Sequence, residues 1–326
     1  MNKIWVFAEQ VECSLDRVVL ELLTKAKELA REMAGETEIA AVLLGCNVES
    51  LVESLGKYGA DKVYLAESEE LKLYNPSIYA PIITELVKEE DPDIFLFGAT
   101  AIGSELCPTI AAQLKTGVAA HCIDMNINKD GKLVATVPSF GGKIVGEILC
   151  PDTRPQMASV KPGIFIQGEE EEREPLVEKV EVNINTENLP LKAISLNKKE
   201  IKGVPLDKAE IVFCGGFGLG NKENWEKLER LAGLFGGAVA CTRPVVDEGW
   251  APGEHLMIGT SGKSVRPKVY IGFGISGATH HVCGIKDSGL IISVNNDEKA
   301  AIFEISDIGI VEDLNKVLDQ LLLKFS

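Results

Sequence analysis

Short apolar runs alternate with amphipathic segments through the first third of the chain. The apolar run at residues 4–8 is followed by apolar side chains at helical spacing between 15 and 33, which predicts a strand and then a helix. The alternation then repeats in three predicted pairs, which are strand 39–44 with helix 48–57, strand 62–65 with helix 77–88, and strand 93–97 with a helix from 102. Strands that alternate with helices require a parallel sheet with right-handed crossovers. The pattern therefore predicts a Rossmann-like α/β domain.

The pattern changes after residue 116, where short polar turns instead of helices separate the apolar runs. Predicted strands at 117–125, 132–137, 143–149 and 157–160 indicate an antiparallel or mixed extension of the first sheet. Two more strand-like segments follow, at 180–184 and 192–196. The polar stretch 197–208 is predicted to be a linker, which gives an N-terminal domain over 1–196 and a C-terminal domain over 209–326.

The C-terminal domain is also predicted to be α/β. Strands are expected at 210–214, 238–241, 269–275 and 290–294, and a final helix is expected at 313–323. The helix after the first of these strands is expected to turn five side chains inward, namely Trp225, Leu228, Leu231, Leu234 and Phe235.

A glycine-rich turn lies between that first strand and its helix, where an α/β domain binds phosphate. Gly216, Gly218 and Gly220 form G-x-G-x-G, which misses the spacing of the dinucleotide fingerprint. A tight turn without ligand contact therefore remains nearly as good an interpretation.

The stretch 269–297 concentrates small residues, hydroxyl groups and imidazoles between and after two predicted strands. The residues of interest are Gly274, Ser276, Gly277 and Ala278, the pair His280 and His281 that follows them, and Asn295 after the second strand. Such loops at the carboxyl ends of strands suit a ligand that the backbone approaches closely. The alternative is a strand-turn-strand unit with two histidines that bond within the protein.

Composition narrows the classes of function. The 326 residues carry a formal net charge of −16, so nucleic acid and anionic membranes are disfavoured as general partners. The longest apolar runs are strand-sized and the first residues lack the order of a signal peptide, so we expect a cytoplasmic protein without membrane insertion. The eight cysteines are scattered without metal-binding spacing, and no metal site is expected.

Several motifs in order resemble the alpha subunit of electron transfer flavoproteins. The C-terminal half contains GGFGLGNKENWEKLERLAGLFGGAVACTRPVVDEGW, GTSGKSVRPKVYIGFGISGATHHVCGIKDS and VNNDEKAAIFEISDIGIVEDL, and the N-terminal half contains IWVFAEQ, GATAIGSELCPTIAAQLKTG and RPQMASVKPG. The resemblance implies an FAD held mainly by the C-terminal domain and a heterodimer with a beta subunit that completes the flavin site. It also implies electron transfer between a flavoprotein dehydrogenase, of the acyl-CoA dehydrogenase type, and an acceptor. An NADH-linked complex that bifurcates electrons stays open.

The resemblance also assigns roles to individual side chains. Ser261 falls beside flavin N5, His281 falls opposite O2, and Arg243 falls over the isoalloxazine, where its charge would raise the reduction potential. His281 is preferred to His280 because the register counted from Ser276, Gly277 and Ala278 places it at the final histidine of the family motif. Neighbouring side chains diverge on an extended segment, so both histidines are not expected to face the same ring edge. The cofactor-binding residues expected as a whole are Gly218, Thr242, Arg243, Gly259, Thr260, Ser261, Gly262, Ser264, Gly274, Ser276, Gly277, Ala278, His280, His281, Asn295 and Asp313. For Arg243 the alternative is a surface or interface salt bridge.

Two motifs depart from the family. This chain has Thr260, Ser261, Gly262 and Lys263 where the family commonly has Gln-Thr-Gly-Lys. It has Thr279 and His280 where Ile-Gln is common, so an amide is replaced by an imidazole. These changes leave the FAD assignment in place and affect the expected redox tuning.

Two other functions remain as alternatives, an NAD-binding oxidoreductase or transferase and a scaffold subunit without a cofactor. No acid–base constellation supports the enzyme, whose nearest candidates are His280 and Asp287.

Overall fold

The structure is a computed structural model that describes residues 1–139, 144–182, 189–196, 203–206 and 208–325. Contacts divide the chain into two compact units, with the break in sequence between positions 197 and 198. The predicted linker begins at that break. Positions 197–202 and 207 lie outside the described residues, so the linker itself stays a prediction.

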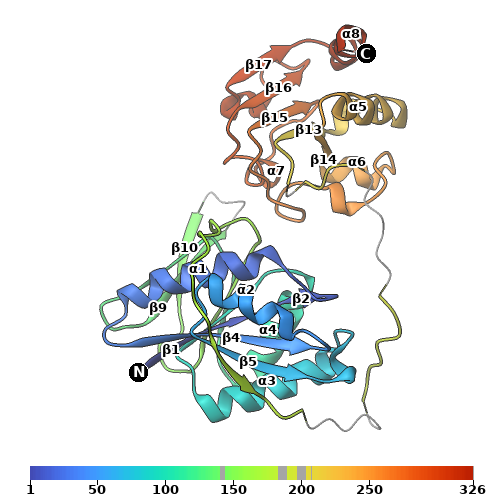
Figure 1. The fold of residues 1–326 in the computed structure, drawn as a ribbon. Coiled ribbons are helices and arrows are strands. Elements are labelled where there is room, and N and C mark those ends of the chain that lie inside the picture. The colour runs from blue at the N-terminus through green and yellow to red at the C-terminus, as the bar shows by residue number, and fades with distance from the viewer. Residues whose placement is uncertain (140–143, 183–188, 197–202, 207, 326) are drawn as a thin grey trace. The chain divides into compact units, whose positions relative to one another are not determined.

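A seven-stranded sheet forms the centre of the N-terminal unit (Figure 1), in the order β12-β5-β4-β1-β6-β11-β7. Every neighbouring pair is parallel. The strands are β1 (Asn2–Phe7), β4 (Thr37–Gly45), β5 (Lys62–Glu67), β6 (Ile94–Gly98), β7 (Val118–Cys122), β11 (Gln156–Val160) and β12 (Leu176–Lys179), and the helices are α1 (Arg17–Glu32), α2 (Val52–Lys57), α3 (Pro76–Glu90) and α4 (Ala101–Leu114). A short hairpin, β2 (Gln10–Val11) and β3 (Ser14–Leu15), follows β1. The predicted parallel α/β domain is confirmed.

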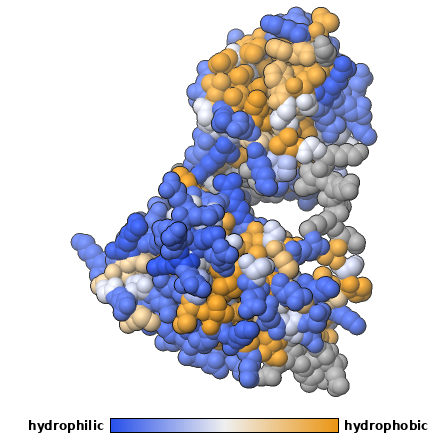
Figure 2. Space-filling view, in the orientation of Figure 1, coloured by the Kyte–Doolittle hydropathy of each residue, from blue (hydrophilic) through white to orange (hydrophobic). Residues whose placement is uncertain are grey.

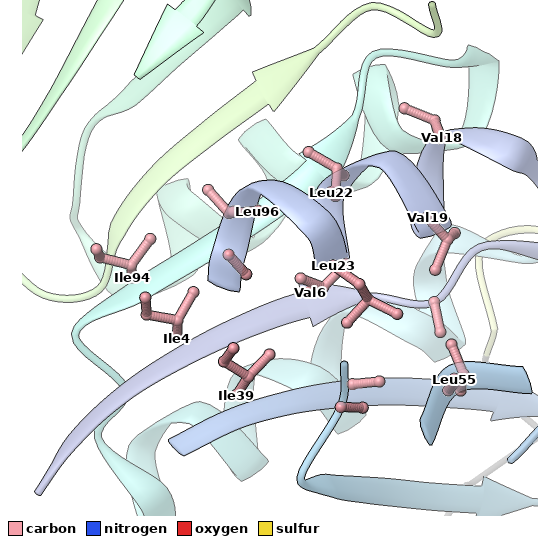
Figure 3. Packing of buried hydrophobic residues seen from close by; sticks show 14 of the residues in the cluster. Ile4, Val6, Val18, Val19, Leu22, Leu23, Ile39, Leu55, Ile94 and Leu96 are labelled. Atoms are coloured by element: carbon pink, nitrogen blue, oxygen red, sulfur yellow. The ribbon is translucent and has the colours of Figure 1, made fainter. Parts of the chain in front are cut away.

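Two apolar cores cover the two faces of this sheet, because side chains alternate along β1. Ile4 and Val6 belong to the core that includes α1, whereas Trp5 and Phe7 belong to the core that includes α3 and α4. Figure 3 shows side chains of α1, such as Leu23, packed over β1. Helix α1 begins at a side-chain cap, since Asp16 accepts a hydrogen bond from the Val18 N–H.

The predicted extension of the first sheet needs correction. Strands β7 and β11 join the parallel sheet, whereas β8 (Asp124–Ile127), β9 (Leu133–Ser139) and β10 (Ile144–Leu149) form a separate antiparallel sheet in the order β10-β9-β8. The predicted strand at 117–125 is therefore two strands. Strand β12 at Leu176–Lys179 precedes the predicted 180–184, of which 183 and 184 lie outside the described residues. Residues 192–196 form no regular strand, so that prediction was wrong.

The C-terminal unit is a five-stranded parallel sheet in the order β14-β13-β15-β16-β17. Its strands are β13 (Ile211–Gly215), β14 (Ala238–Cys241), β15 (Val269–Phe273), β16 (Ile291–Asn295) and β17 (Ile308–Val311), and its helices are α5 (Lys222–Leu234), α6 (Arg243–Asp247), α7 (Thr279–Val282) and α8 (Leu314–Phe325). A second α/β unit was predicted, but β17, α6 and α7 were not.

One face of helix α5 packs as the spacing predicted. Trp225, Leu228 and Leu231 are buried in the core of the unit. Leu234 and Phe235 were expected inward but are 44% and 39% exposed, because the helix ends at Leu234 and the chain turns there. Apolar side chains also lie among polar ones at the surface of both units (Figure 2). Among the described residues no helix has the length and apolar character needed to cross a membrane.

Candidate functional site

A cavity of about 790 Å³ lies at the carboxyl ends of the strands of the C-terminal unit. The loops after β13, β14, β15 and β16 each contribute to its wall, through Gly218, Thr242, Gly274 and Asp297 respectively. In the strand order β14-β13-β15-β16-β17, the chain passes from β13 to its neighbour β14 on one side and then to its neighbour β15 on the other side. The cavity therefore lies at the topological switch point, where open α/β sheets bind their ligands.

The structure brings nearly all of the predicted site residues together. The lining residues among them are Gly218, Thr242, Arg243, Gly259, Thr260, Ser261, Gly262, Gly274, Ser276, Ala278, His280, His281 and Asn295. Asp313 lines a smaller cavity of about 250 Å³ that shares Gly218, Gly274 and Asn295 with the larger one. Ser264 and Gly277 do not line either cavity. This convergence is a matter of position, and cofactor binding by these residues stays a prediction.

Other lining residues were not predicted. Phe217 lines the cavity while 60% exposed, and its ring stacks on Trp250 with centroids 5.9 Å apart. Lys299, a few residues beyond β16, also lines the cavity, and its backbone N–H donates to the Asp297 carboxylate at 2.9 Å. Lys299 follows a strand end, which is a signal that could have found it. Ala301 begins the short 3-10 helix η7 (Ala301–Ile305) and also lies in the motif VNNDEKAAIFEISDIGIVEDL, which could have found it.

Close contact between two loops brings backbone to the cavity. The Gly218 N–H donates to the Gly274 carbonyl at 3.0 Å, and a Cβ on Gly218 would come within 2.7 Å of the Gly274 Cα. Gly277 has a φ of +89°, and a Cβ there would lie 2.1 Å from the Ile302 nitrogen. Side chains at these positions would push the loops apart, so glycine is required by the packing.

Helix α7 and the loop 258–264 are joined by several hydrogen bonds. The Thr260 N–H donates to the His280 carbonyl at 2.8 Å, and the Thr260 hydroxyl lies 3.2 Å from His280 Nδ1. His280 is exposed, whereas His281 is only 6% exposed. The premise that this histidine pair lies on an extended segment was wrong, because residues 279–282 form a helical turn.

His281 has protein partners for both ring nitrogens. Its Nε2 lies 2.7 Å from the Tyr270 hydroxyl, and its Nδ1 lies 3.1 Å from the Ile258 carbonyl oxygen. Burial lowers the pKa of His281 to about 4, so the ring is neutral at pH 7. His281 thus bonds within the protein, as the alternative interpretation of the histidine pair expected. Its ring also lines the cavity.

Arg243 carries an exposed positive charge at the cavity wall. It begins the short helix α6, and its Nε lies 3.5 Å from an Asp247 carboxylate oxygen, with the two side chains 63% and 57% exposed. An exposed pair of this kind contributes little free energy. The guanidinium can therefore leave Asp247 for an anionic or aromatic ligand at small cost.

The corresponding edge of the N-terminal sheet is occupied by the protein's own carboxyl group. Glu9, which follows β1, is 4% exposed and accepts a hydrogen bond from the Thr100 hydroxyl at 2.5 Å. Thr100 caps helix α4, and the Glu9 carboxyl also bonds the Gly103 N–H in the first turn. Phosphate groups bind at helix N-termini of this kind. Glu9 thus covers the first turn of α4, and a nucleotide is better accommodated in the C-terminal unit.

Comparison with known proteins gives the family. Residues 4–185 match the model of the electron transfer flavoprotein domain, and residues 205–286 match that of the electron transfer flavoprotein FAD-binding domain. The chain is 41% identical to the electron transfer flavoprotein subunit alpha of Clostridium acetobutylicum, over 99% of this chain and 98% of the relative. It is 39% identical to the acryloyl-CoA reductase electron transfer subunit beta of Anaerotignum propionicum, over 98% and 94%. It is 35% identical to the lactate dehydrogenase (NAD(+),ferredoxin) subunit LctC of Acetobacterium woodii, over 98% and 76%. The chain therefore belongs to the electron transfer flavoprotein family, among its alpha subunits.

Proposed function

We propose that the chain binds one FAD in the cavity of its C-terminal unit and, in a cytoplasmic heterodimer with a beta subunit, transfers electrons between a flavoprotein dehydrogenase and an acceptor. The observation that carries the proposal is the cavity of about 790 Å³ at the switch point of the unit that matches the FAD-binding domain. Small-molecule and cofactor sites commonly have volumes of about 300–1,000 Å³. The size and the position of the cavity both suit a dinucleotide.

The residues at the cavity fit the parts of FAD. Main-chain groups that the glycine contacts bring to the wall, together with Ser276 and Ala278, suit the pyrophosphate and the ribityl chain. Lys299 adds a positive charge to the wall, and we assign it to the same anionic groups. Asn295 and Asp313, which border the smaller cavity, suit the hydroxyl and amine groups of the adenosine.

Bound FAD would supply the redox chemistry, since it accepts and releases electrons singly or in pairs. The protein's contribution is to hold the ring and to set the free energy of reduction. We assign to Arg243, a cation on the wall, the role of stabilising negative charge gained by the ring, and Ser261 offers an exposed hydroxyl as a hydrogen-bond donor. Thr260 and His280 stand where the family commonly has amides, and they bond each other at 3.2 Å. We infer that this bond replaces contacts that the amides would make.

Exposed apolar side chains support the proposed beta subunit. Strand β10 is an edge strand of its sheet, and Ile144, Val145, Ile148 and Leu149 on it are between 37% and 56% exposed. An exposed apolar edge strand is a ready surface for another chain. A heterodimer would remove these side chains from water.

The named relatives suggest the class of donor. One is called an electron transfer subunit of acryloyl-CoA reductase, and another is called a subunit of a lactate dehydrogenase that uses NAD⁺ and ferredoxin. We propose a dehydrogenase of the acyl-CoA type as the partner. A bifurcating complex that also uses NADH and a low-potential acceptor is the second form of the proposal.

The test is co-expression of the chain with a beta subunit, followed by purification and cofactor analysis. We expect a 1:1 heterodimer that is yellow and releases FAD on denaturation, and we expect an acyl-CoA dehydrogenase with its substrate to reduce that FAD. Bound nicotinamide nucleotide instead of flavin would favour the NAD-binding alternative. A colourless heterodimer that does not take up added FAD would overturn the proposal.

A further inference from the structure

A pair of aromatic side chains lies at the wall of the cavity in the C-terminal unit. Phe217 begins the short 3-10 helix η5 (Phe217–Leu219), lines the cavity and is 60% exposed. Its ring stacks on that of Trp250, with the centroids 5.9 Å apart and the ring planes inclined by 20°. Aromatic rings attract one another at such centroid distances. One face of Phe217 is thus held by Trp250, and most of the residue stays exposed at the cavity wall.

Trp250 gives the pair a fixed base. Its N–H donates to the Val245 carbonyl at 3.0 Å, and its side chain packs against the apolar core that contains Val245 and Leu256. Val245 lies in helix α6, which begins at Arg243. The turn that carries Trp250 is therefore attached to the same helix as the cation on the cavity wall.

The two glycines beside Phe217 leave its side chain one direction. A Cβ on Gly216 would come within 2.2 Å of the Gly274 carbonyl oxygen, and a Cβ on Gly218 would come within 2.7 Å of the Gly274 Cα. The main chain on both sides of Phe217 is therefore pressed against the loop after β15. Strand β14 lies on the other side of β13 and leads into α6. The ring of Phe217 meets Trp250 on that side.

The neighbours of the pair indicate the end of the cavity to which it belongs. Arg243, which is assigned to the flavin ring, begins the helix that holds Trp250. Asn295 and Asp313 are assigned to the adenosine. Asn295 ends β16 and Asp313 follows β17, and these strands lie beyond β15 on the opposite side of β13. The aromatic pair therefore lies at the flavin end of the cavity.

We propose that Phe217, held by Trp250, stacks on the isoalloxazine ring of FAD. The inference deepens the proposed function and rests on it. Because the two aromatic rings are nearly parallel, a third planar ring can continue the stack on the free face of Phe217. Stacking would also remove apolar surface of Phe217 from water. The Phe217 ring carries no charge, so it contributes to the affinity for the flavin and to its orientation.

The first measurement is the FAD affinity of the heterodimer with a beta subunit. Loss of one aromatic contact should weaken FAD binding by about two- to twelvefold in Phe217→Ala. Phe217→Tyr keeps the ring and should bind FAD as the wild type does. Phe235→Ala is the matched control, because Phe235 is 39% exposed and packs on the Phe325 ring but lines neither cavity of this unit. Equal FAD affinity of Phe217→Ala and the wild type, or the same loss in Phe235→Ala, would overturn the proposal.

The second measurement is the visible absorption spectrum of the bound flavin at saturating FAD, which reports on rings in contact with the isoalloxazine. We expect the flavin bands of Phe217→Ala to move to shorter wavelength, and those of Phe217→Tyr and Phe235→Ala to match the wild type. A loss of affinity in Phe217→Ala with unchanged bands would place Phe217 at another part of FAD and overturn the proposal.

The two proposals fail in different ways. A wild-type heterodimer that binds no FAD would refute the proposed function, and the stacking of Phe217 with it. A wild-type heterodimer that binds FAD with the same affinity and the same flavin bands as Phe217→Ala would refute the stacking alone.

Discussion

Glu9→Gln should stabilise the N-terminal unit at alkaline pH and have little effect at acidic pH. Burial is the main cause that raises the pKa of Glu9 from an ordinary 4.5 to about 7, and the nearby Asp16 carboxylate raises it further. The hydrogen bonds from Thr100 and Gly103 act in the opposite direction and lower the pKa. The carboxyl is 4% exposed, so solvent screens little of this effect. A glutamine has nearly the same shape, can accept from the Thr100 hydroxyl and carries no charge.

The magnitude follows from the two pKa values. The folded protein holds the Glu9 proton more tightly than the unfolded chain, so the contribution of Glu9 to stability is present below pH 4.5 and is lost as the pH rises through about 7. A difference of about 2.5 pH units at about 1.4 kcal/mol each corresponds to roughly 3 kcal/mol. The ionised carboxylate of the wild type accepts hydrogen bonds that the glutamine does not fully replace. We therefore expect a gain of about 1 to 3 kcal/mol in the unfolding free energy of Glu9→Gln at pH 8.5.

Hydrogen exchange read by mass spectrometry is the suitable assay, because peptides from β1 and α4 report on the N-terminal unit alone. Exchange is followed in the wild type, in Glu9→Gln and in Glu89→Gln, which makes the same change of charge at an exposed position of α3. We expect protection of β1 and α4 to rise in Glu9→Gln at pH 8.5 and to match the wild type at pH 4.5. A pH-independent effect, or the same effect in Glu89→Gln, would refute the reasoning.

Three further predictions concern the cofactor. Arg243→Ala should keep FAD but lower the midpoint potential of the flavin, because a unit charge about 4 Å away is worth roughly 1 to 4 kcal/mol, or about 20 to 90 mV for two electrons. A redox titration checks this, with Arg243→Lys as the control that keeps the charge. An unchanged potential in Arg243→Ala would place Arg243 away from the ring. Gly277→Ala should lose most of its FAD in equilibrium binding, because the added Cβ would lie 2.1 Å from the Ile302 nitrogen at a φ of +89°. Gly236→Ala is the control, since it has a φ of +62° and open space around the added Cβ, and it should be strained yet bind FAD normally. Equal FAD binding by the two variants would contradict the role of close packing. The isolated chain should bind FAD more weakly than the heterodimer and should associate through its apolar surface, and a stable flavin-loaded monomer in light scattering would argue against this.

The sequence by itself determined the elements that bury one face. Helix α1 was expected from apolar residues between 15 and 33 and is found at Arg17–Glu32, because only helical spacing places those side chains in one core. The central strands of both sheets were predicted for a similar reason, since their side chains are buried on both faces and form continuous apolar runs. Family motifs then identified the loops that follow those strands.

Exposed and very short elements could not be predicted in the same way. All side chains of the edge strands β12 and β17 are exposed, so main-chain pairing with β5 and β16 defines them and leaves little trace in the apolar pattern. Helix α7 has only four residues, fewer than the two turns in which helical spacing becomes visible. For this reason His280 and His281 were expected on an extended segment.

Only the tertiary structure decided how the site is assembled. Gly218 and Gly274 are far apart in sequence, and their main chains touch because β13 and β15 are neighbours in the sheet. His281 bonds Tyr270 and Ile258, which are 11 and 23 positions away, and no local pattern specifies those partners. The residue type of His281 could be recognised from a motif. The hydrogen that it carries, and the group to which it donates, depend on burial and on neighbours that only the folded chain brings within hydrogen-bonding distance.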